Sequence, residues 1–299
     1  MTSSLVEAIA AGPVVLDGGL ATQLESQGHN LDSKLWSAQL LHDDPDAIVQ
    51  AHLAFFAAGA QVATTASYQA STGGFAKAGI GRDEAEQLIR RSVRLAEQAR
   101  TSFEDGNDRW IAGSVGPYGA ALGDGSEYRG DYDISVDELR AWHRPRIAWL
   151  AEADVDVLAL ETIPCLAEVE ALLAEIDGSR LPCWLSVTCA GDRTRAGEPA
   201  AEAFSLARDI DEIVAVGVNC VDPAAAYSLV RSASECSGKP VVVYPNSGER
   251  WDPGARSWIG PAIFHPEDVT DWISGGARLV GGCCRVGPTE IQAIHDLVG

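Results

Sequence analysis

The sequence predicts an α/β protein folded as one (β/α)₈ barrel of the TIM type, and three observations support this. Short apolar runs alternate eight times with helical patterns along the 299 residues. The runs are continuously apolar and rich in β-branched residues, as is typical of parallel strands buried on both faces. No GxGxxG motif follows any run, so a doubly wound dinucleotide-binding sheet lacks its usual fingerprint. We expect a single domain over residues 1–299, with its active site at the C-terminal rim of the strands.

The predicted elements follow one another in strict alternation. The strands are expected at 14–17, 61–67, 110–116, 155–161, 183–189, 213–220, 241–246 and 278–284. The helices are expected at 44–59, 82–99, 135–153, 165–176, 201–210, 222–234, 265–274 and 288–298. Asp44 is a suitable N-cap for the first helix, with Pro45 at its first position and Gly59 as its stop. Pro145 is expected to kink or break the third helix, because proline lacks the N–H that the helix uses.

Two long stretches show no periodicity, and we expect them to be loops over the active face of the barrel. They cover residues 18–37, after the first strand, and 117–133, after the third. Long loops of this kind often carry binding or catalytic groups on a rigid scaffold.

The composition excludes several classes of function. With 46% hydrophobic and 22% charged residues, the chain can bury a large core. Its formal net charge of -21 argues against nucleic acid or an anionic membrane as a partner and favours small-molecule substrates. No apolar segment is long enough for a membrane span, and the first residues lack a basic n-region, so we expect a cytoplasmic protein. The oligomeric state is left open.

Three of the seven cysteines are expected to lie on one rim of the barrel. Cys220 ends the sixth strand, and the adjacent Cys283 and Cys284 end the eighth. Three thiolates suit Zn²⁺ and leave one position of a tetrahedral ion open. Gly281 and Gly282 allow a close approach of the backbone there. The alternative is that cysteine acts as a small hydrophobe, which we expect for Cys165, Cys183 and Cys236, while Cys189 stays open.

Four motifs of the chain stand out together: "LDGGLAT", "LALETIP", "GVNC" and "GGCCR". With these motifs the sequence resembles the homocysteine S-methyltransferase family of zinc-dependent barrels, and the similarity runs from Val14 to Leu297. It implies that Cys220, Cys283 and Cys284 bind zinc and that the homocysteine sulfur takes the open position. In its length, this chain is similar to the standalone members of the family, which use S-methylmethionine or S-adenosylmethionine as the methyl donor. The resemblance therefore implies methyl transfer from a sulfonium donor to homocysteine, forming methionine.

The chemistry of such a site can be argued from its ligands. A free thiol is mostly protonated at neutral pH, whereas coordination to zinc removes the proton and gives a nucleophilic sulfur. Three thiolate ligands leave electron density on the substrate sulfur, which suits alkyl transfer better than the activation of water. Thiolate and sulfonium are both neutralised in the reaction, so a dry cavity favours it.

Other residues at strand ends are candidates for substrate binding. Asp17 and Glu161 end the first and fourth strands, and their carboxylates could hold the α-ammonium group of an amino acid. Alternatively, Asp17 caps the following glycine turn and Glu161 pairs with an arginine at the rim. Gly18, Thr64 and Asn219 could add hydrogen bonds, although Asn219 could instead orient the loop of Cys220.

Some alternatives remain open at this stage. The resemblance suggests Tyr68 as an oxygen ligand of zinc when substrate is absent, but Tyr68 could equally be a packed aromatic. The histidines form no HExxH pair and are given no metal role. A selenol such as selenohomocysteine is an alternative acceptor. A zinc hydrolase and a noncatalytic metal-storage or redox-sensing protein are the alternatives from other classes.

Overall fold

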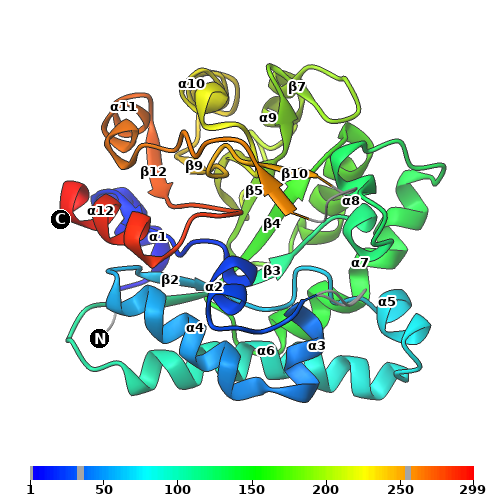
Figure 1. The fold of residues 1–299 in the computed structure, drawn as a ribbon. Coiled ribbons are helices and arrows are strands. Elements are labelled where there is room, and N and C mark those ends of the chain that lie inside the picture. The colour runs from blue at the N-terminus through cyan, green and yellow to red at the C-terminus, as the bar shows by residue number, and fades with distance from the viewer. Residues whose placement is uncertain (1–2, 32–36, 253–256) are drawn as a thin grey trace.

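Eight parallel strands form the centre of the computed structural model, which describes residues 3–31, 37–252 and 257–299. Figure 1 shows them inside a ring of helices. Their order is β1-β12-β9-β8-β5-β4-β3-β2, and a parallel bridge between Leu16 and Val62 joins the two ends. The predicted (β/α)₈ barrel is therefore confirmed. The barrel strands are β1 (Val14–Val15), β2 (Val62–Thr64), β3 (Trp110–Val115), β4 (Val157–Ile163), β5 (Cys183–Val187), β8 (Ile213–Asn219), β9 (Val241–Tyr244) and β12 (Ala277–Val280).

All eight predicted helices are present in the ring. They are α4 (Pro45–Ala57), α6 (Arg82–Ser102), α7 (Val136–Ala151), α8 (Leu166–Ile176), α9 (Ala200–Leu206), α10 (Pro223–Ser237), α11 (Val269–Ser274) and α12 (Pro288–Val298). At the start of α4, the Asp44 side chain accepts a hydrogen bond from the backbone N–H of Ala47, and Pro45 is the first helical residue. Gly59 follows the helix with φ of 93°, a conformation that glycine adopts without strain.

The predictions for Pro145 and for the two loops need correction. Helix α7 continues through Pro145 without a break, so the expected break is wrong, whereas a kink at this position stays a prediction. The stretches expected to be loops contain short helices: α2 (Leu20–Ser26) and the start of α3 (Ser37–Asp43) in the first, and the 3₁₀ turns η1 (Tyr118–Ala121) and η2 (Ser126–Tyr128) in the second. Residues 32–36 of the first stretch lie outside the described part of the chain. Helices of one or two turns carry little periodicity of their own, and these lie outside the strand–helix alternation that located the equally short α9 and α11.

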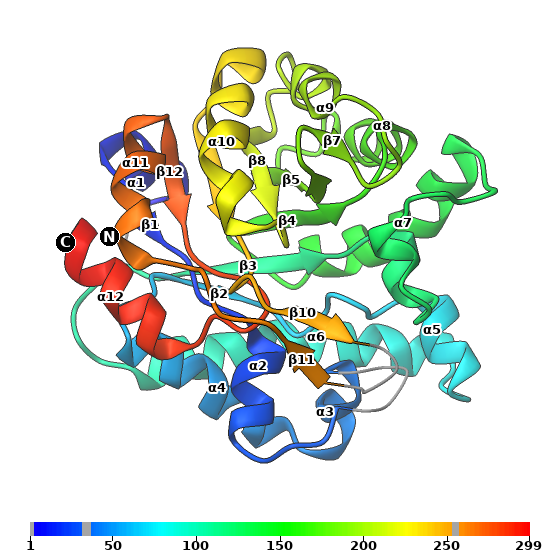
Figure 2. The same cartoon turned by 45° about the horizontal axis from the view of Figure 1, so that its top comes forward.

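Additional short elements decorate the barrel. Helix α1 (Leu5–Ala11) precedes β1 and packs Leu5 and Ile9 against the residues that fill the barrel interior. Helix α5 (Thr72–Lys77) lies before α6, and the 3₁₀ turn η3 (Pro266–Asp268) leads into α11. Two hairpins, β6–β7 (Cys189–Ala190 and Arg193–Thr194) and β10–β11 (Arg250–Asp252 and Ser257–Ile259), follow β5 and β9. The β10–β11 hairpin can be followed in orange in Figure 2.

Two groups of buried apolar residues hold the barrel together. One fills the barrel interior and includes Trp184, Trp110 and Leu279, each at most 4% exposed. The other lies between the strands and the surrounding helices and includes Phe55, Phe204 and Trp272. These groups fix the strands, so the side chains that follow them are held on a rigid frame. Among the described residues, no helix is both long and apolar enough to cross a membrane.

Candidate active site

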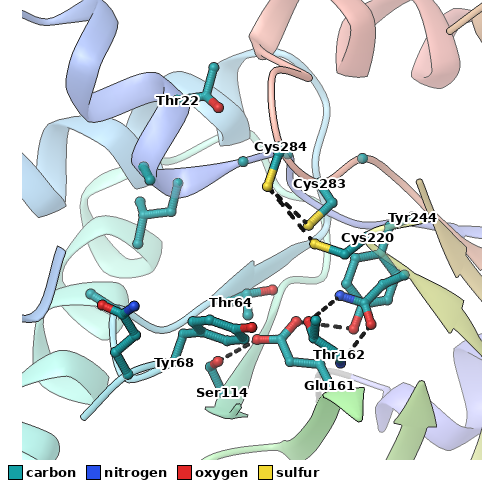
Figure 3. Close-up of a pocket in the computed structure, with 18 of the residues that line it drawn as sticks. Thr22, Thr64, Tyr68, Ser114, Glu161, Thr162, Cys220, Tyr244, Cys283 and Cys284 are labelled. Atoms are coloured by element: carbon teal, nitrogen blue, oxygen red, sulfur yellow. Dashed lines mark hydrogen bonds between the residues drawn. The ribbon is translucent and has the colours of Figure 1, made fainter. Parts of the chain in front are cut away.

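A cavity of about 550 Å³ opens at the carboxyl ends of the barrel strands. It contains every residue that the sequence suggested for the site, although these residues come from distant parts of the chain (Figure 3). The nine residues are Asp17, Gly18, Thr64, Tyr68, Glu161, Asn219, Cys220, Cys283 and Cys284. The barrel thus brings the predicted residues together, as expected for strand ends on one rim.

Three cysteine sulfurs form a compact group in this cavity. The Sγ atoms of Cys220 and Cys284 are 3.9 Å apart, and those of Cys283 and Cys284 are 4.0 Å apart. All three sulfurs lie within 4.8 Å of one another. Zn–S bonds of about 2.3 Å in a tetrahedron place sulfurs about 3.8 Å apart, so the spacing fits such an ion. In the described part of the chain, this is the one group of three or more Cys, His, Asp or Glu residues with such spacing.

Local backbone features bring these sulfurs together. Cys220 has φ of 50°, a left-handed conformation that is unfavourable for a residue with a side chain and that turns the chain directly after β8. After β12, a Cβ added to Gly281 would lie 2.7 Å from Leu16 Cβ and 2.8 Å from the Asp17 carbonyl oxygen. Only glycine allows the chain to pass β1 so closely. The Cys284 N–H is then held by Asn246 Oδ1 at 3.1 Å.

The three thiols have unequal acidity. Hydrogen bonds from Cys220 and Cys283 lower the pKa of Cys284, and a hydrogen bond with the Tyr128 side chain contributes to this effect. The hydrogen bond with Cys220 and the burial of the group raise the pKa of Cys283. Ionisation of one thiol therefore opposes ionisation of its two neighbours. A thiophilic cation would stabilise all three thiolates.

Glu161 points into the cavity from an irregular part of β4. The pairing of β4 with β5 changes register between Leu160 and Ile163, and Thr162 has φ of 60°. Such a bulge changes the direction of a side chain. Here Asn219 holds the bulge, because its Oδ1 accepts a hydrogen bond from the Thr162 N–H at 2.7 Å. The Asn219 Nδ2 donates to Thr162 Oγ1 at 2.7 Å. The Asn219 side chain thus connects β8 to the bulge that carries Glu161.

The Glu161 carboxylate is buried and accepts two hydrogen bonds. Ser114 Oγ donates to Oε1, and the hydroxyl of Tyr244 donates to Oε2 at 3.1 Å. Burial raises the pKa of Glu161 to about 7, even though both hydrogen bonds favour the ionised form. No arginine forms an ion pair with Glu161 among the described residues, in contrast to the alternative considered from the sequence.

Asp17 is the second buried carboxylate of the cavity. Its oxygens accept hydrogen bonds from the N–H of Thr64 at 2.7 Å and from the Thr64 hydroxyl at 2.8 Å. Asp17 therefore joins β1 to β2 through its side chain, and it does not cap the glycine turn that follows it. Burial raises the pKa of Asp17 to about 7, and the charge of Glu161 adds to the rise.

The tyrosines of the cavity occupy different places. Figure 3 shows the ring of Tyr68 beside Ser114 and Glu161, with the three cysteine sulfurs above it in the view. The Tyr68 side chain contacts that of Thr162, whereas the tyrosine that hydrogen-bonds to Cys284 is Tyr128. A role of Tyr68 as a metal ligand therefore stays a prediction.

Sequence reasoning missed the residues that support Glu161. Ser114 is the next-to-last residue of β3 and Tyr244 is the last residue of β9, but both lie inside the strands expected from the sequence, at 110–116 and 241–246, so the strand-end rule did not select them. Cys189, left open above, is buried in the β6–β7 hairpin outside the group of three sulfurs. Cys165 and Cys183 are also buried and Cys236 is half-buried, and none of them belongs to that group.

The barrel and the thiol-lined cavity at its rim define a (β/α)₈ enzyme with a candidate site for a thiophilic metal. Residues 14–298 match the family described as Homocysteine S-methyltransferase. The chain is 45% identical to Homocysteine S-methyltransferase YbgG of Bacillus subtilis, with 94% of this chain and 93% of that protein aligned. It is 39% identical to Selenocysteine Se-methyltransferase of Brassica oleracea, with 95% of this chain and 88% of that protein aligned. The chain belongs to the homocysteine S-methyltransferase family.

A solved structure agrees with this assignment. The metallated form of the homocysteine methyltransferase MmuM from Escherichia coli matches the fold with a TM-score of 0.86 and 38% sequence identity, over 96% of both chains. The similarity thus extends over nearly the whole barrel and includes the strands that carry the cavity.

Proposed function

We propose that this protein transfers a methyl group from a sulfonium donor, S-methylmethionine or S-adenosylmethionine, to homocysteine and so forms methionine. The observation that carries the proposal is the group of three cysteine sulfurs, 3.9 and 4.0 Å apart, in the cavity at the carboxyl ends of the strands. Family membership supports the reaction class.

Cys220, Cys283 and Cys284 would hold a zinc ion. Their spacing fits a tetrahedral ion, and their sulfur donors match the preference of Zn²⁺ for soft ligands. Bound zinc would lower the pKa of a coordinated thiol and so supply a nucleophilic sulfur at neutral pH. The rim backbone around Gly281 and Asn246 fixes the direction of the two adjacent cysteines.

The two buried carboxylates would recognise the amino acid part of homocysteine. Glu161 and Asp17 lie in the same cavity as the thiols, and an α-ammonium group would offset the unfavourable burial of their negative charge. Ser114 and Tyr244 hold the Glu161 carboxylate, and Thr64 holds that of Asp17. The substrate therefore meets charged groups whose positions are fixed before it binds.

A selenol is a second candidate acceptor, favoured by the identity of 39% to a protein named Selenocysteine Se-methyltransferase. A selenol is more acidic than a thiol and would fit the same group of cysteines. Competition between homocysteine and selenohomocysteine, with the methylated products measured by mass spectrometry, decides which acceptor has the higher kcat/KM.

Zinc-edge X-ray absorption with and without homocysteine tests the proposal. The expected spectra show three sulfur ligands in the free protein and four with homocysteine, and the protein should form methionine from S-methylmethionine. A ligand set that includes nitrogen, or a sulfur count unchanged by homocysteine, would contradict the proposed site. Release of hydrolysis products without any thiol acceptor would instead favour a zinc hydrolase.

A further inference from the structure

Glu127 is a carboxylate of the cavity that the reaction described so far does not use. It belongs to the 3₁₀ turn η2, in the long segment between β3 and α7, and it lines the same cavity as the cysteines. Its Oε2 atom is buried and has no hydrogen-bond partner among the described residues. A buried carboxylate oxygen without a partner is unfavourable unless a ligand supplies one.

Among the described residues, no lysine or arginine forms an ion pair with Glu127, although the charge of Arg129 stabilises its ionised form. Arg129, two residues further on, forms its ion pairs with Asp131 at 3.2 Å and Asp124 at 3.9 Å. The described residues that line the cavity include neither lysine nor arginine, but they include four carboxylates. Two of these, Asp17 and Glu161, already accept hydrogen bonds from neighbouring side chains. The described lining of the cavity is therefore acidic, and Glu127 is the carboxylate in it with a buried unpaired oxygen.

Glu127 lies close enough to the thiol group to interact with it electrostatically. Burial raises the pKa of Glu127, and the negative charges of Asp124 and Cys284 add to this effect, while a backbone hydrogen bond and the charge of Arg129 oppose it. The charge of Glu127 in turn raises the pKa of Tyr68, which also lines the cavity. A positively charged ligand that approaches the cysteine sulfurs would therefore meet the field of this carboxylate.

We propose that Glu127 determines the preference for a charged donor by holding the sulfonium group of the methyl donor beside the acceptor sulfur. This inference rests on the proposed function. In the reaction, the acceptor thiolate sulfur forms a bond to the methyl carbon while the S–CH₃ bond of the donor breaks. The bonding electron pair stays on the donor sulfur, so thiolate and sulfonium become two neutral thioethers and no proton moves. The Glu127 carboxylate attracts the positively charged sulfur of the donor but not the neutral thioether sulfur of the product. The donor therefore binds more tightly than the product and replaces it.

This role predicts a specific kinetic signature. A carboxylate stabilises the full positive charge of the bound donor more than the smaller charge of the transition state. Removal of the carboxylate charge should therefore raise the KM for the donor without lowering kcat. The KM for homocysteine and the zinc content should stay unchanged, because these depend on Glu161, Asp17 and the three cysteines.

Two ligands that differ only in the charge at one atom show whether Glu127 interacts with the sulfonium or with another group of the donor. Dimethylsulfoniopropionate and 4-methylpentanoate have the same shape, with S⁺ in the first replaced by CH in the second, and neither has an amino group. Calorimetric titration of each into the zinc-loaded parent and Glu127→Gln proteins measures binding without turnover. We expect Glu127→Gln to weaken dimethylsulfoniopropionate roughly 10- to 100-fold, the range for a charged contact, and to leave 4-methylpentanoate unchanged.

Two further variants serve as controls. Asp131→Asn removes one negative charge from the exposed part of the same segment and should change neither titration. Glu127→Asp keeps the charge and should retain part of the preference for the sulfonium. Equal melting temperatures of the variants and the parent show that the cavity is intact.

The outcomes distinguish this inference from the proposed function. An unchanged affinity for dimethylsulfoniopropionate in Glu127→Gln would overturn the role of Glu127, and so would an equal loss for 4-methylpentanoate. A KM for S-methylmethionine that rises while dimethylsulfoniopropionate binds as before would also overturn it, because Glu127 would then hold the α-ammonium group. By contrast, a parent protein that forms no methionine from any sulfonium donor would refute the proposed function, whereas the titrations would still test the sulfonium site.

Discussion

Glu161 is the residue whose substitution best separates substrate recognition from metal chemistry. Its carboxylate is held by Ser114 and Tyr244, and it lies in the cavity without being part of the sulfur group. If it binds the α-ammonium of homocysteine, Glu161→Gln should weaken homocysteine binding by about 1.5 to 3 kcal/mol. Zinc content should remain at the level of the parent protein. Titration of homocysteine into the zinc-loaded proteins measures the change.

The control for Glu161→Gln is a thiol without the amino group. 3-Mercaptopropionate should bind to parent and variant equally, because it offers no ammonium to the carboxylate. An equal loss for both thiols, or a loss of zinc, would mean that Glu161 has a structural role. Asp17 would then be the next candidate for the ammonium group.

The same carboxylates predict a pH dependence of recognition. Burial raises the pKa values of Glu161 and Asp17 to about 7 in the free protein, so both groups take up protons as the pH falls through this value. An ammonium group binds to the ionised form, so its binding must release these protons and becomes weaker below pH 7. The affinity ratio of homocysteine to 3-mercaptopropionate should therefore fall from pH 8 to pH 6. This ratio cancels the contribution of the thiol proton, which both ligands share.

Substitution of Glu161 provides the check on this pH dependence. In Glu161→Gln, one of the two titrating groups is absent, so the ratio should change less steeply with pH than in the parent protein. A ratio that stays constant between pH 6 and pH 8 in the parent protein would show that neither carboxylate contacts the ammonium group.

At the level of single residues, the sequence predicted which residues lie at the rim of the barrel better than it predicted their hydrogen-bond partners. Cysteines and carboxylates at strand ends identified one rim, because the carboxyl ends of parallel strands in a barrel meet there. The partners of Glu161 were not predicted, since Ser114 lies 47 residues away in the chain. The role of Asn219 in holding the bulge at Thr162 also depends on a register shift that periodicity does not reveal.

Among the elements, helix α7 is connected most directly to the rim. Arg146 is buried, and its guanidinium donates to the carbonyl oxygens of Tyr68 at 3.1 Å and Gly116 at 2.5 Å, just after β2 and β3. It also donates to His143 Nδ1 at 3.0 Å, so the ring proton of His143 lies on Nε2, 2.8 Å from Glu168 in α8. Burial lowers the pKa of His143, which agrees with a neutral ring.

Replacement of Arg146 tests this connection. Arg146→Met would leave the carbonyl oxygens of Tyr68 and Gly116 and the Nδ1 of His143 buried without their donor, so we expect the free energy of unfolding to fall by at least about 3 kcal/mol. Urea denaturation measures the change. Arg144→Met is the matched control, because Arg144 lies on the exposed face of the same helix and pairs with Glu175 at 2.8 Å. It should cause no measurable change, and an equal effect of the two substitutions would refute the special role of Arg146.

The elements also show why the sequence prediction was incomplete. Long helices such as α6 have a clear apolar face and were predicted. Of the helices with six or seven residues, α9 and α11 were found because each follows a predicted strand, whereas α1 and α2 stand outside that alternation and were missed. Such short helices are stabilised by packing more than by propensity. Pro145 was expected to kink or break α7, but the helix continues through it without a break.

For the whole molecule, the question is how far the metal site supports the fold. The barrel has two large apolar groups of its own, one inside the strands and one between strands and helices. The three cysteines lie at the rim, outside most of this buried surface. Binding of zinc to the folded state alone would still raise the melting temperature through linkage, without being required for folding. The fold and the metal site should therefore be separable.

Alanine substitution of the cysteines tests this separation. Replacing Cys220, Cys283 or Cys284 should remove both zinc and methyl transfer, because two sulfurs and a weak oxygen donor hold the ion poorly. The circular dichroism spectrum should match that of the parent protein, and unfolding should stay cooperative with a lower melting temperature. Metal analysis and thermal scans on the same samples measure both effects. Full zinc occupancy in Cys284→Ala would refute the three-thiolate site, and global unfolding of the parent protein by a chelator would show that the barrel depends on the metal.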